Sequence, residues 1–290
     1  MLSQLQDNVW FFLLAAGLLG LAAGSFLNVV IHRLPIMMRR AWRRECQEWL
    51  NSKDGHIDTA AEERYNLLVP RSHCPNCGHR IGVLENIPII SFTALGGRCA
   101  KCHTPISRRY PLIEALTALL SIAVAWRFGF AWVTAAVLLF TWALIALAAI
   151  DLETKLLPDS ITLPALWLGV LLNMGGVFTD LQSSVLGAIF GYLSLWFVYH
   201  VFKLLTGKEG MGFGDFKLLA MLGAWAGWQA LPLIILLSSA LGALVGVSLI
   251  LLLGRDRNIP IPFGPYLAVA GWIALLWGAP ITDWYLRHAT

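Results

Sequence analysis

Long apolar runs separated by short polar stretches dominate the chain, and the first begins almost at its start. A run from about Val9 to Ile31 is long enough to span a bilayer, for which about 20 apolar residues suffice. It lacks a basic leader and is too long for a signal-peptide core, so we expect it to remain as a helix. Seven further apolar segments follow, at roughly Leu112–Trp126, Trp132–Ile150, Ile161–Met174, Val185–Leu204, Phe216–Trp228, Leu231–Leu253 and Tyr266–Trp277.

This pattern predicts an all-α polytopic membrane protein of about eight helices. Several segments are shorter than the length that crosses the hydrocarbon core unaided, and Phe216–Trp228 is expected to be only partly embedded. The composition agrees, since 58% of the 290 residues are hydrophobic and only 13% are charged, about half the charged share of a soluble domain. Two soluble domains are therefore excluded.

The basic residues predict the orientation in the membrane. Thirteen of the 21 Lys and Arg residues lie between Arg33 and Arg109. If this polar region is cytoplasmic and the segments alternate, 19 basic residues fall inside and 2 outside, as the positive-inside rule requires. The net charge of +4 is concentrated there, so we expect no nucleic-acid partner. The predicted domains are a first transmembrane helix (1–32), a cytoplasmic domain (33–109) and a transmembrane bundle (110–290).

The polar region carries all five cysteines of the chain. Four of them form two Cys-x-x-Cys pairs separated by 21 residues, and they are Cys74, Cys77, Cys99 and Cys102. Two such pairs are typical of tetrahedral thiolate binding of a structural zinc ion, with no open position for catalysis. A redox pair or an iron–sulfur cluster is the alternative. Cys46 is left over.

The polar region also begins with a basic helical pattern. Met37–Leu50 is predicted to form an amphipathic helix whose arginines meet anionic lipid. Before it, Ser25, Asn28 and His32 recur at helical spacing near the end of the first apolar run. These polar groups either hold helices together at the boundary or line a pocket near the interface.

Two aspartates stand at the ends of apolar segments. Asp215 follows a glycine-rich stretch, Gly210–Gly214, and opens an apolar helix, whereas Asp151 ends the third segment. The predicted topology places both at the cytoplasmic face. Paired carboxylates share one proton, so the ionised member can draw a proton from water while the other hydrogen-bonds a substrate carbonyl.

Other interpretations of these acids stay open from spacing alone. Asp215 can simply cap a helix, although Asp159 fits that role better, and Lys217 is placed to anchor the loop or balance charge. Glu153 and Glu209 lie near the aspartates and compete for either role. A proton-coupled transporter would use the same pair of acids, and a zinc-organised assembly scaffold would leave them unexplained.

Four motifs in order make the chain resemble the type IV prepilin peptidases over nearly its whole length. They are Gly24–Pro35, the paired Cys-x-x-Cys motifs followed by Ile106–Pro111, Ile150-Asp151 ahead of Leu157-Pro158-Asp159, and Gly212-Phe213-Gly214-Asp215. Gly-x-Gly-Asp alone is moderately specific, whereas all four in this order are very specific.

The resemblance implies that Asp151 and Asp215 are catalytic acids of an aspartyl endopeptidase in the bacterial inner membrane, with the active site facing the cytoplasm. It implies substrates: type IV prepilins and the pseudopilins of type II secretion, cut after the glycine that ends a short basic leader. It also implies methylation of the new amino terminus with S-adenosylmethionine. No motif assigns the methyl-donor pocket to particular residues, and the insertion Arg39–Glu63 belongs to no motif.

Overall fold

Helices make up the regular structure of this protein. The computed structural model describes residues 8–54, 64–82, 84–254 and 261–289. Within these ranges there is no strand beyond two isolated β-bridges. Six helices are long and apolar enough to cross a membrane, namely α2 (Val9–Asp54), α4 (Arg109–Phe128), α5 (Trp132–Thr154), α7 (Leu181–Thr206), α9 (Leu231–Leu253) and α10 (Gly264–Ala289).

Shorter helices complete the set. The apolar helices α6 (Asp159–Met174) and α8 (Phe213–Ala226) have 16 and 14 residues. Three one-turn elements are η1 (Leu84–Asn86), α3 (Ile90–Ala94) and η2 (Trp228–Ala230). The eight longer helices confirm the predicted all-α polytopic architecture. The chain divides into two compact units, Met1–Phe130 and Ala131–Thr290.

In the first unit, α2 and α4 pack with their backbones almost touching. A Cβ atom on Gly20 would lie 2.7 Å from the Cα of Ala118, and one on Gly24 would lie 2.7 Å from the Cα of Glu114. The order of these contacts makes the two helices antiparallel. Small residues at such spacing allow the close approach that holds membrane helices together.

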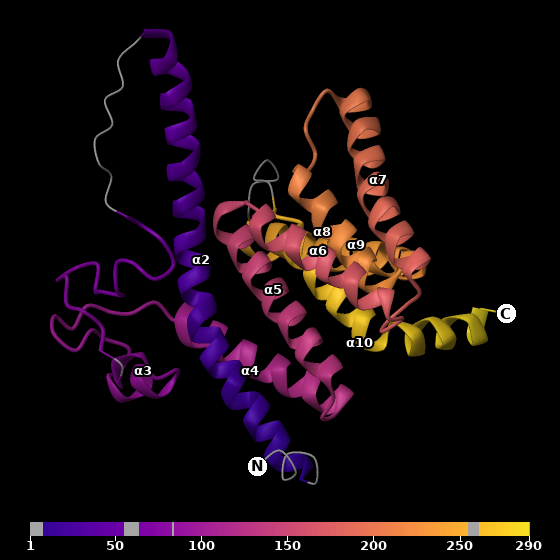
Figure 1. Ribbon diagram of the computed structural model, residues 1–290. Helices are drawn as coiled ribbons and strands as arrows, with labels where there is room; N and C mark the ends of the chain where they lie inside the picture. The colour runs from indigo at the N-terminus through magenta and orange to yellow at the C-terminus, as the bar shows by residue number, and fades with distance from the viewer. Residues whose placement is uncertain (1–7, 55–63, 83, 255–260, 290) are drawn as a thin grey trace. The chain divides into compact units, whose positions relative to one another are not determined.

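The first helix is longer than the sequence pattern predicted. We expected a span ending near Ile31 and a separate helix over Met37–Leu50, but α2 runs without interruption from Val9 to Asp54 through Pro35 (Figure 1). Of the expected loop Asn51–Glu63, the first four residues belong to α2 and residues 55–63 lie outside the described part. The basic segment is thus a continuation of the span rather than an independent surface helix.

A buried arginine holds the next described segment against this helix. Arg33 is 7% exposed, and its guanidinium donates to the carbonyls of Asn66 (2.9 Å) and Pro70 (2.6 Å). The Tyr65 ring lies beside the same guanidinium, 5.7 Å from ring centre to Cζ. A buried guanidinium needs such acceptors, so Arg33 fixes where the segment at residues 66–70 returns to α2.

In the second unit, α8 forms the core. From Phe216 to Trp225 its side chains are buried apart from Lys217, and a helix that is apolar on all faces is expected to lie inside a bundle. Gly187 and Gly191 of α7 allow that helix to reach the α8 backbone at Gly223 and Leu219. Because it is surrounded, α8 can carry a polar residue at its first turn into a protected position.

Helices α6 and α8 lie side by side and parallel, since contacts join their N-terminal ends and their C-terminal ends. At their C-terminal ends, Asn173 donates to the carbonyl of Ala224 (2.9 Å), and the indole of Trp225 donates to the carbonyl of Ala165 (2.8 Å). At their N-terminal ends, Lys217 pairs with Asp159 at 2.7 Å. This register sets the first turn of α8 beside the turn that connects α5 to α6.

Candidate active site

Asp151 lies at the end of α5, where the helix gives way to a tight turn. The helix stops at Thr154 because Lys155 adopts a left-handed conformation (φ 56°) and its N–H returns to the carbonyl of Asp151. The Asp151 side chain is 5% exposed. Its Oδ2 accepts a hydrogen bond of 3.0 Å from the backbone N–H of Gly264, the first residue of α10.

Asp215 occupies the first turn of α8 and is 7% exposed. The negative charges of Asp215 and Asp151 act on each other, so the two acids that the sequence paired are neighbours. Oδ1 of Asp215 is buried without a hydrogen-bond partner among the described residues. An unsatisfied buried carboxylate oxygen beside a second carboxylate is costly, and it is suited to hold a shared proton or a water molecule.

Leu157 lies against two glycines beside the acids, Gly214 before Asp215 and Gly264 next to Asp151. Leu157 is in the turn after α5. A Cβ atom added to Gly214 would lie only 2.8 Å from the Cβ of Leu157. A Cβ atom on Gly264 would be 3.3 Å from Leu157 Cδ2 and 2.6 Å from Asp151 Oδ2. Both glycines are therefore required by close contact, and three chain segments converge at the acids.

The structure does not place the rival acids in this pair. Glu209 is exposed and pairs with Lys203 at 2.8 Å, while Glu153 is exposed on the last turn of α5. Lys217 binds both carboxylate oxygens of Asp159, at 2.9 and 2.7 Å. Of the two roles predicted for Lys217, the structure therefore supports the anchor, which joins α8 to α6.

Neither Asp215 nor Asp159 is the N-cap residue of its helix. The N-cap residue of α8 is Gly212 and that of α6 is Pro158, and neither helix has a side-chain cap. Asp215 stands at the third helical position and Asp159 at the first. Both benefit from the positive end of a helix, and the Asp215 carboxylate also accepts a hydrogen bond from the backbone N–H of Gly212.

One residue of this site was missed by sequence reasoning. Gly264 contributes a backbone N–H rather than a side chain, and any non-proline residue carries that group. The available signal was Phe263-Gly264-Pro265, a glycine ahead of a proline at the start of an apolar segment. Only the absence of room for a Cβ atom shows why glycine is needed there.

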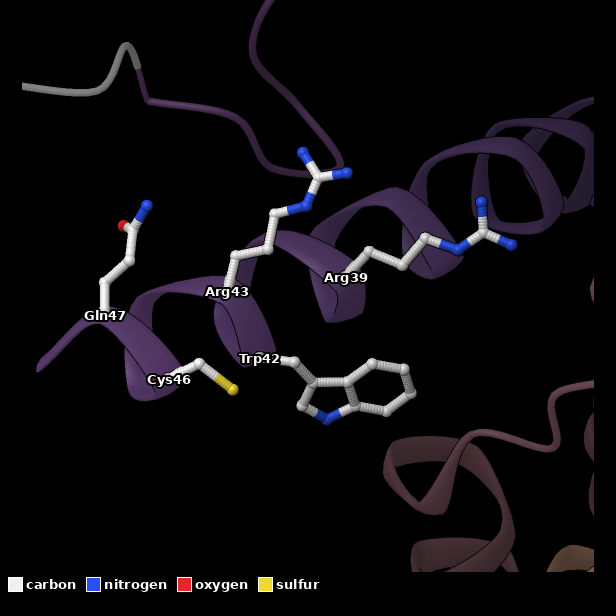
Figure 2. A pocket seen from close by; sticks show the side chains of 5 residues that line it. All are labelled: Arg39, Trp42, Arg43, Cys46 and Gln47. Carbon is white, nitrogen blue, oxygen red and sulfur yellow. The ribbon is translucent and has the colours of Figure 1, made fainter. Parts of the chain in front are cut away.

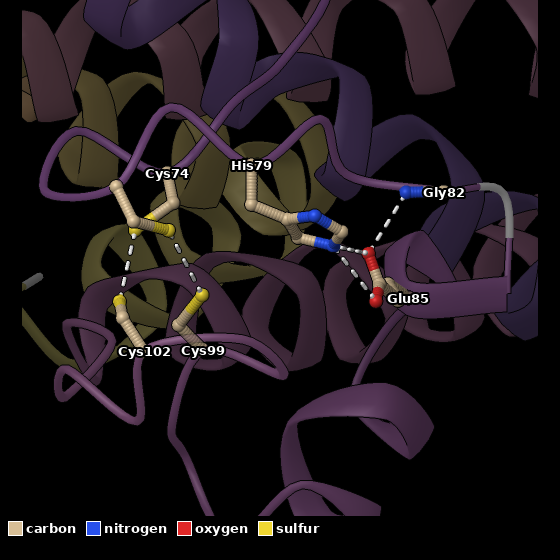
Figure 3. Close-up of polar contacts among 7 residues, drawn as sticks. Cys74, His79, Gly82, Glu85, Cys99 and Cys102 are labelled. Carbon is tan, nitrogen blue, oxygen red and sulfur yellow. Dashed lines mark hydrogen bonds and ion pairs between the residues drawn. The ribbon is translucent and has the colours of Figure 1, made fainter.

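The four predicted cysteines meet in the first unit. Their sulfur atoms all lie within 4.8 Å of one another, with 3.7 Å between Cys74 and Cys102 and 4.0 Å between Cys77 and Cys99 (Figure 3). Tetrahedral zinc with Zn–S bonds of about 2.3 Å separates its sulfurs by about 3.8 Å, whereas a disulfide needs about 2.0 Å. The donor set therefore fits a four-coordinate metal ion.

Each Cys-x-x-Cys pair sits in the same backbone turn. In the first, Gly78 (φ 68°) donates to the carbonyl of Cys74, and in the second His103 (φ 54°) donates to that of Cys99. A β-bridge closes each turn, at His73–Arg80 and Arg98–Pro105. The repeated turn aims two thiols from each hairpin at one point.

The surroundings of Cys74 and Cys102 favour the thiolate, whereas burial and hydrogen bonds with the other thiols raise the pKa of Cys77 to about 11. Hydrogen bonds from the hydroxyl and the backbone N–H of Thr104 lower the pKa of Cys102 to about 5. Those from the backbones of Cys77 and Asn76 lower the pKa of Cys74. Metal binding requires thiolates, so the turns prepare two of the four ligands, Cys74 and Cys102, for a metal ion.

His79 flanks the cluster but engages a carboxylate instead. Its Nε2 lies 3.2 Å from Glu85, which also accepts from the backbone N–H of Gly82 at 2.9 Å (Figure 3). The hydrogen bond from Gly82 lowers the pKa of Glu85 most, and the one with His79 lowers it further. His79 is thus paired with Glu85 and is not part of the four-cysteine cluster.

A hollow also lies along the C-terminal half of α2. All five lining residues come from α2 itself: Arg39, Trp42, Arg43, Cys46 and Gln47 (Figure 2). In Figure 2 their side chains spread along one side of the helix without converging on a point. We assign no site to it.

The fold and these two centres define a class of protein. It is a multi-pass membrane protein with two interacting buried carboxylates in one helical unit and, in the other unit, four cysteines that can hold a metal ion. The model of the bacterial peptidase A24 N-terminal domain matches residues 18–128, and that of the type IV leader peptidase family matches residues 138–247. The chain belongs to the type IV leader peptidase family.

Relatives of nearly equal length support this assignment. A protein of Aeromonas hydrophila named prepilin leader peptidase/N-methyltransferase is 59% identical, covering 96% of this chain and 95% of its own. One of the same name from Pseudomonas aeruginosa is 56% identical, covering 100% and 98%. A third, from Legionella pneumophila, is 44% identical, covering 96% of each. No solved structure matches the chain.

Proposed function

We propose that this protein removes the leader of type IV prepilins and pseudopilins and methylates the amino terminus that cleavage exposes. The family and relatives named for both activities, aligned over nearly the whole chain, support this function. The observation that carries the peptidase half is the burial of Asp151 and Asp215 as interacting neighbours. S-adenosylmethionine supplies the methyl group when it is bound.

Asp151 and Asp215 share one proton in the proposed cleavage. The ionised carboxylate takes a proton from a water molecule, whose oxygen attacks the scissile carbonyl carbon. The protonated carboxyl group donates to the carbonyl oxygen and stabilises the charge that develops there. When the C–N bond breaks, the proton held by the pair passes to the leaving amine. The Gly264 N–H keeps Asp151 oriented throughout.

The position of the acids favours a peptidase over a proton-coupled transporter. Transporter sites are typically near the bilayer midplane, whereas Asp151 lies in the last turn of α5 and Asp215 in the first turn of α8. The distribution of basic residues supports an inner-membrane protein whose helix ends at Asp151 and Asp215 face the cytoplasm. There the apolar helix of a substrate can lie in the membrane while its basic leader meets anionic lipid headgroups.

The cysteine cluster would hold one structural zinc ion through Cys74, Cys77, Cys99 and Cys102. All four positions are thiols, so the ion would have no open position for substrate. Its contribution would be to fold the polar domain, residues 33–109 in the proposed division into 1–32, 33–109 and 110–290. The short elements of this region, η1 and α3, have no buried residue of their own, so metal binding would supply the missing stability.

Incubation of the purified protein with a prepilin and a labelled methyl donor tests the whole function. The expected product begins at the residue after the leader glycine and carries the label on its amino terminus. A product that is cut but never labelled would support the peptidase activity and contradict the methyltransferase activity. A prepilin that is returned intact would contradict the proposal.

A further inference from the structure

A second buried polar centre lies in the first unit, where α2 and α4 meet at the end nearest the cysteine domain. Its members are Ser25 and Asn28 of α2 and Glu114 of α4. Asn28 is 3% exposed and Glu114 is 8% exposed. The glycine contacts that bring the two helix backbones together force these side chains into the interface, so their burial is built into the packing.

The hydrogen bonds among the described residues do not use all the acceptor sites of this centre. Glu114 Oε2 accepts from the backbone N–H of Ile89 (2.8 Å), and Ser25 hydrogen-bonds the same carboxylate. Asn28 donates to the carbonyl of Tyr110 (3.1 Å), but its own Oδ1 is buried without a partner among the described residues. A carboxylate offers about four lone-pair sites, of which these two partners occupy only part.

Arg33, one turn beyond Asn28 on α2, does not serve this centre. The Arg33 guanidinium donates to three backbone carbonyls, of Asn66, Leu67 and Pro70. What the centre lacks is a small group with several N–H donors and a positive charge, since a buried carboxylate and a buried amide oxygen are both stabilised by such a partner. Ser25 is only partly buried, so the centre is not sealed.

We propose that Asn28 and Glu114 bind the free α-amino group of the processed substrate and hold it for methylation. This inference rests on the proposed function. That reaction requires a primary amine at the polar end of an apolar substrate helix. A primary ammonium offers three N–H donors and one positive charge, which is the chemistry that the Asn28 oxygen and the Glu114 carboxylate can both accept. These residues would then belong to the methyl-transfer site and not to the peptidase site.

A structural role for Glu114 alone would look different. Glu114 accepts a hydrogen bond from the backbone N–H of Ile89, a residue with a positive φ of 60°. Glu114 therefore also restrains the turn before α3. That restraint does not use the Asn28 oxygen. An amine-binding site needs both residues, whereas a purely structural carboxylate predicts no penalty for losing an unpaired Asn28 oxygen.

The test compares two peptides as competitors of methylation in the full-length, solubilised protein. Both carry the mature pilin N-terminal sequence, and one lacks the α-amino group. In the unchanged protein the amine-bearing peptide should compete about 10- to 100-fold better, as expected for a hydrogen bond to a charged group. In Glu114→Gln and Asn28→Leu most of this preference should be lost, while prepilin cleavage and zinc content stay unchanged.

Thr117→Val is the matched control, because that hydroxyl is also buried in the interface but donates within α4 to the carbonyl of Ile113. It should keep the full preference. The proposal is overturned if both test variants retain the preference, or if they lose cleavage and zinc together with methylation. An unchanged protein that transfers no methyl group would instead contradict the proposed function.

Discussion

The backbone N–H of Gly264 donates to the carboxylate of Asp151 across 113 positions of the chain, at 3.0 Å. The bond ties the first residue of α10 to the end of α5. It orients one acid of the proposed pair through a group that no side-chain motif would reveal. The approach leaves no space for a larger residue, since a Cβ atom would lie 2.6 Å from Asp151 Oδ2.

Gly264→Ala should therefore lower prepilin cleavage by about 10²-fold, since a displacement of about 1 Å at a catalytic group has that effect. The rate of leader removal by the purified variant checks this. Gly278→Ala is the matched control on the same helix, because its nearest neighbours would be 3.9 Å away. Equal activity of the two variants would show that the Gly264 contact is dispensable.

Lys217 should matter less than its position beside Asp215 suggests. It pairs with Asp159, and both side chains are partly exposed, so the pair should contribute ~1 kcal/mol or less. Lys217→Met should keep cleavage within about fivefold, which is the same energy expressed as a rate. Lys203→Met, which removes the exposed pair with Glu209 on α7, provides the comparison. Complete inactivation by Lys217→Met alone would mean that the lysine acts on the acids directly.

Metal analysis should find about one zinc ion per chain. Cys74→Ser should lose it, because a serine hydroxyl is a poor substitute for a thiolate in a four-sulfur site. Cys46→Ser, which changes the exposed cysteine of α2, should retain the full amount. Zinc bound at full stoichiometry by the Cys74 variant would refute the four-ligand site.

Acid should weaken the cysteine domain partly through Glu85. Its pKa is lowered in the folded protein by the Gly82 N–H and by His79. A depressed pKa contributes stability above the ordinary value, and that stability is lost as the pH falls through the folded value. Glu85→Gln should make the domain more sensitive to proteolysis at neutral pH, with the difference vanishing in acid. Glu45→Gln on exposed α2 should show no such difference, and a gap that widens in acid would contradict this account.

Much of this architecture could be predicted from the sequence because its signals are local. Apolar runs predicted six of the eight longer helices to within about four residues, whereas α2 and α10 continue well past their predicted ends. The spacing of the Cys-x-x-Cys pairs was enough to expect the cluster. The pairing of Asp151 with Asp215 followed from placing both at helix ends on one side of the membrane, and the family assignment and function were confirmed by the comparisons.

What the sequence did not reveal depends on contacts between distant segments. The span was expected to end near Ile31, yet α2 continues through Pro35, as membrane helices tolerate when surrounding groups compensate. Two features arise from packing that no local pattern encodes. They are the buried Asn28 oxygen, which has no hydrogen-bond partner among the described residues, and the bond from Gly264 to Asp151. The assignment of catalytic roles to Asp151 and Asp215 stays a prediction.

The most direct measurement is leader removal by Asp151→Asn and by Asp215→Asn, each purified with its zinc content verified. An amide of the same shape can neither take the proton of water nor share one with its neighbour. Each variant should lose cleavage by about 10³-fold or more, as when one member of a catalytic unit is removed. Substantial cleavage by either folded variant would contradict a mechanism based on two carboxylates.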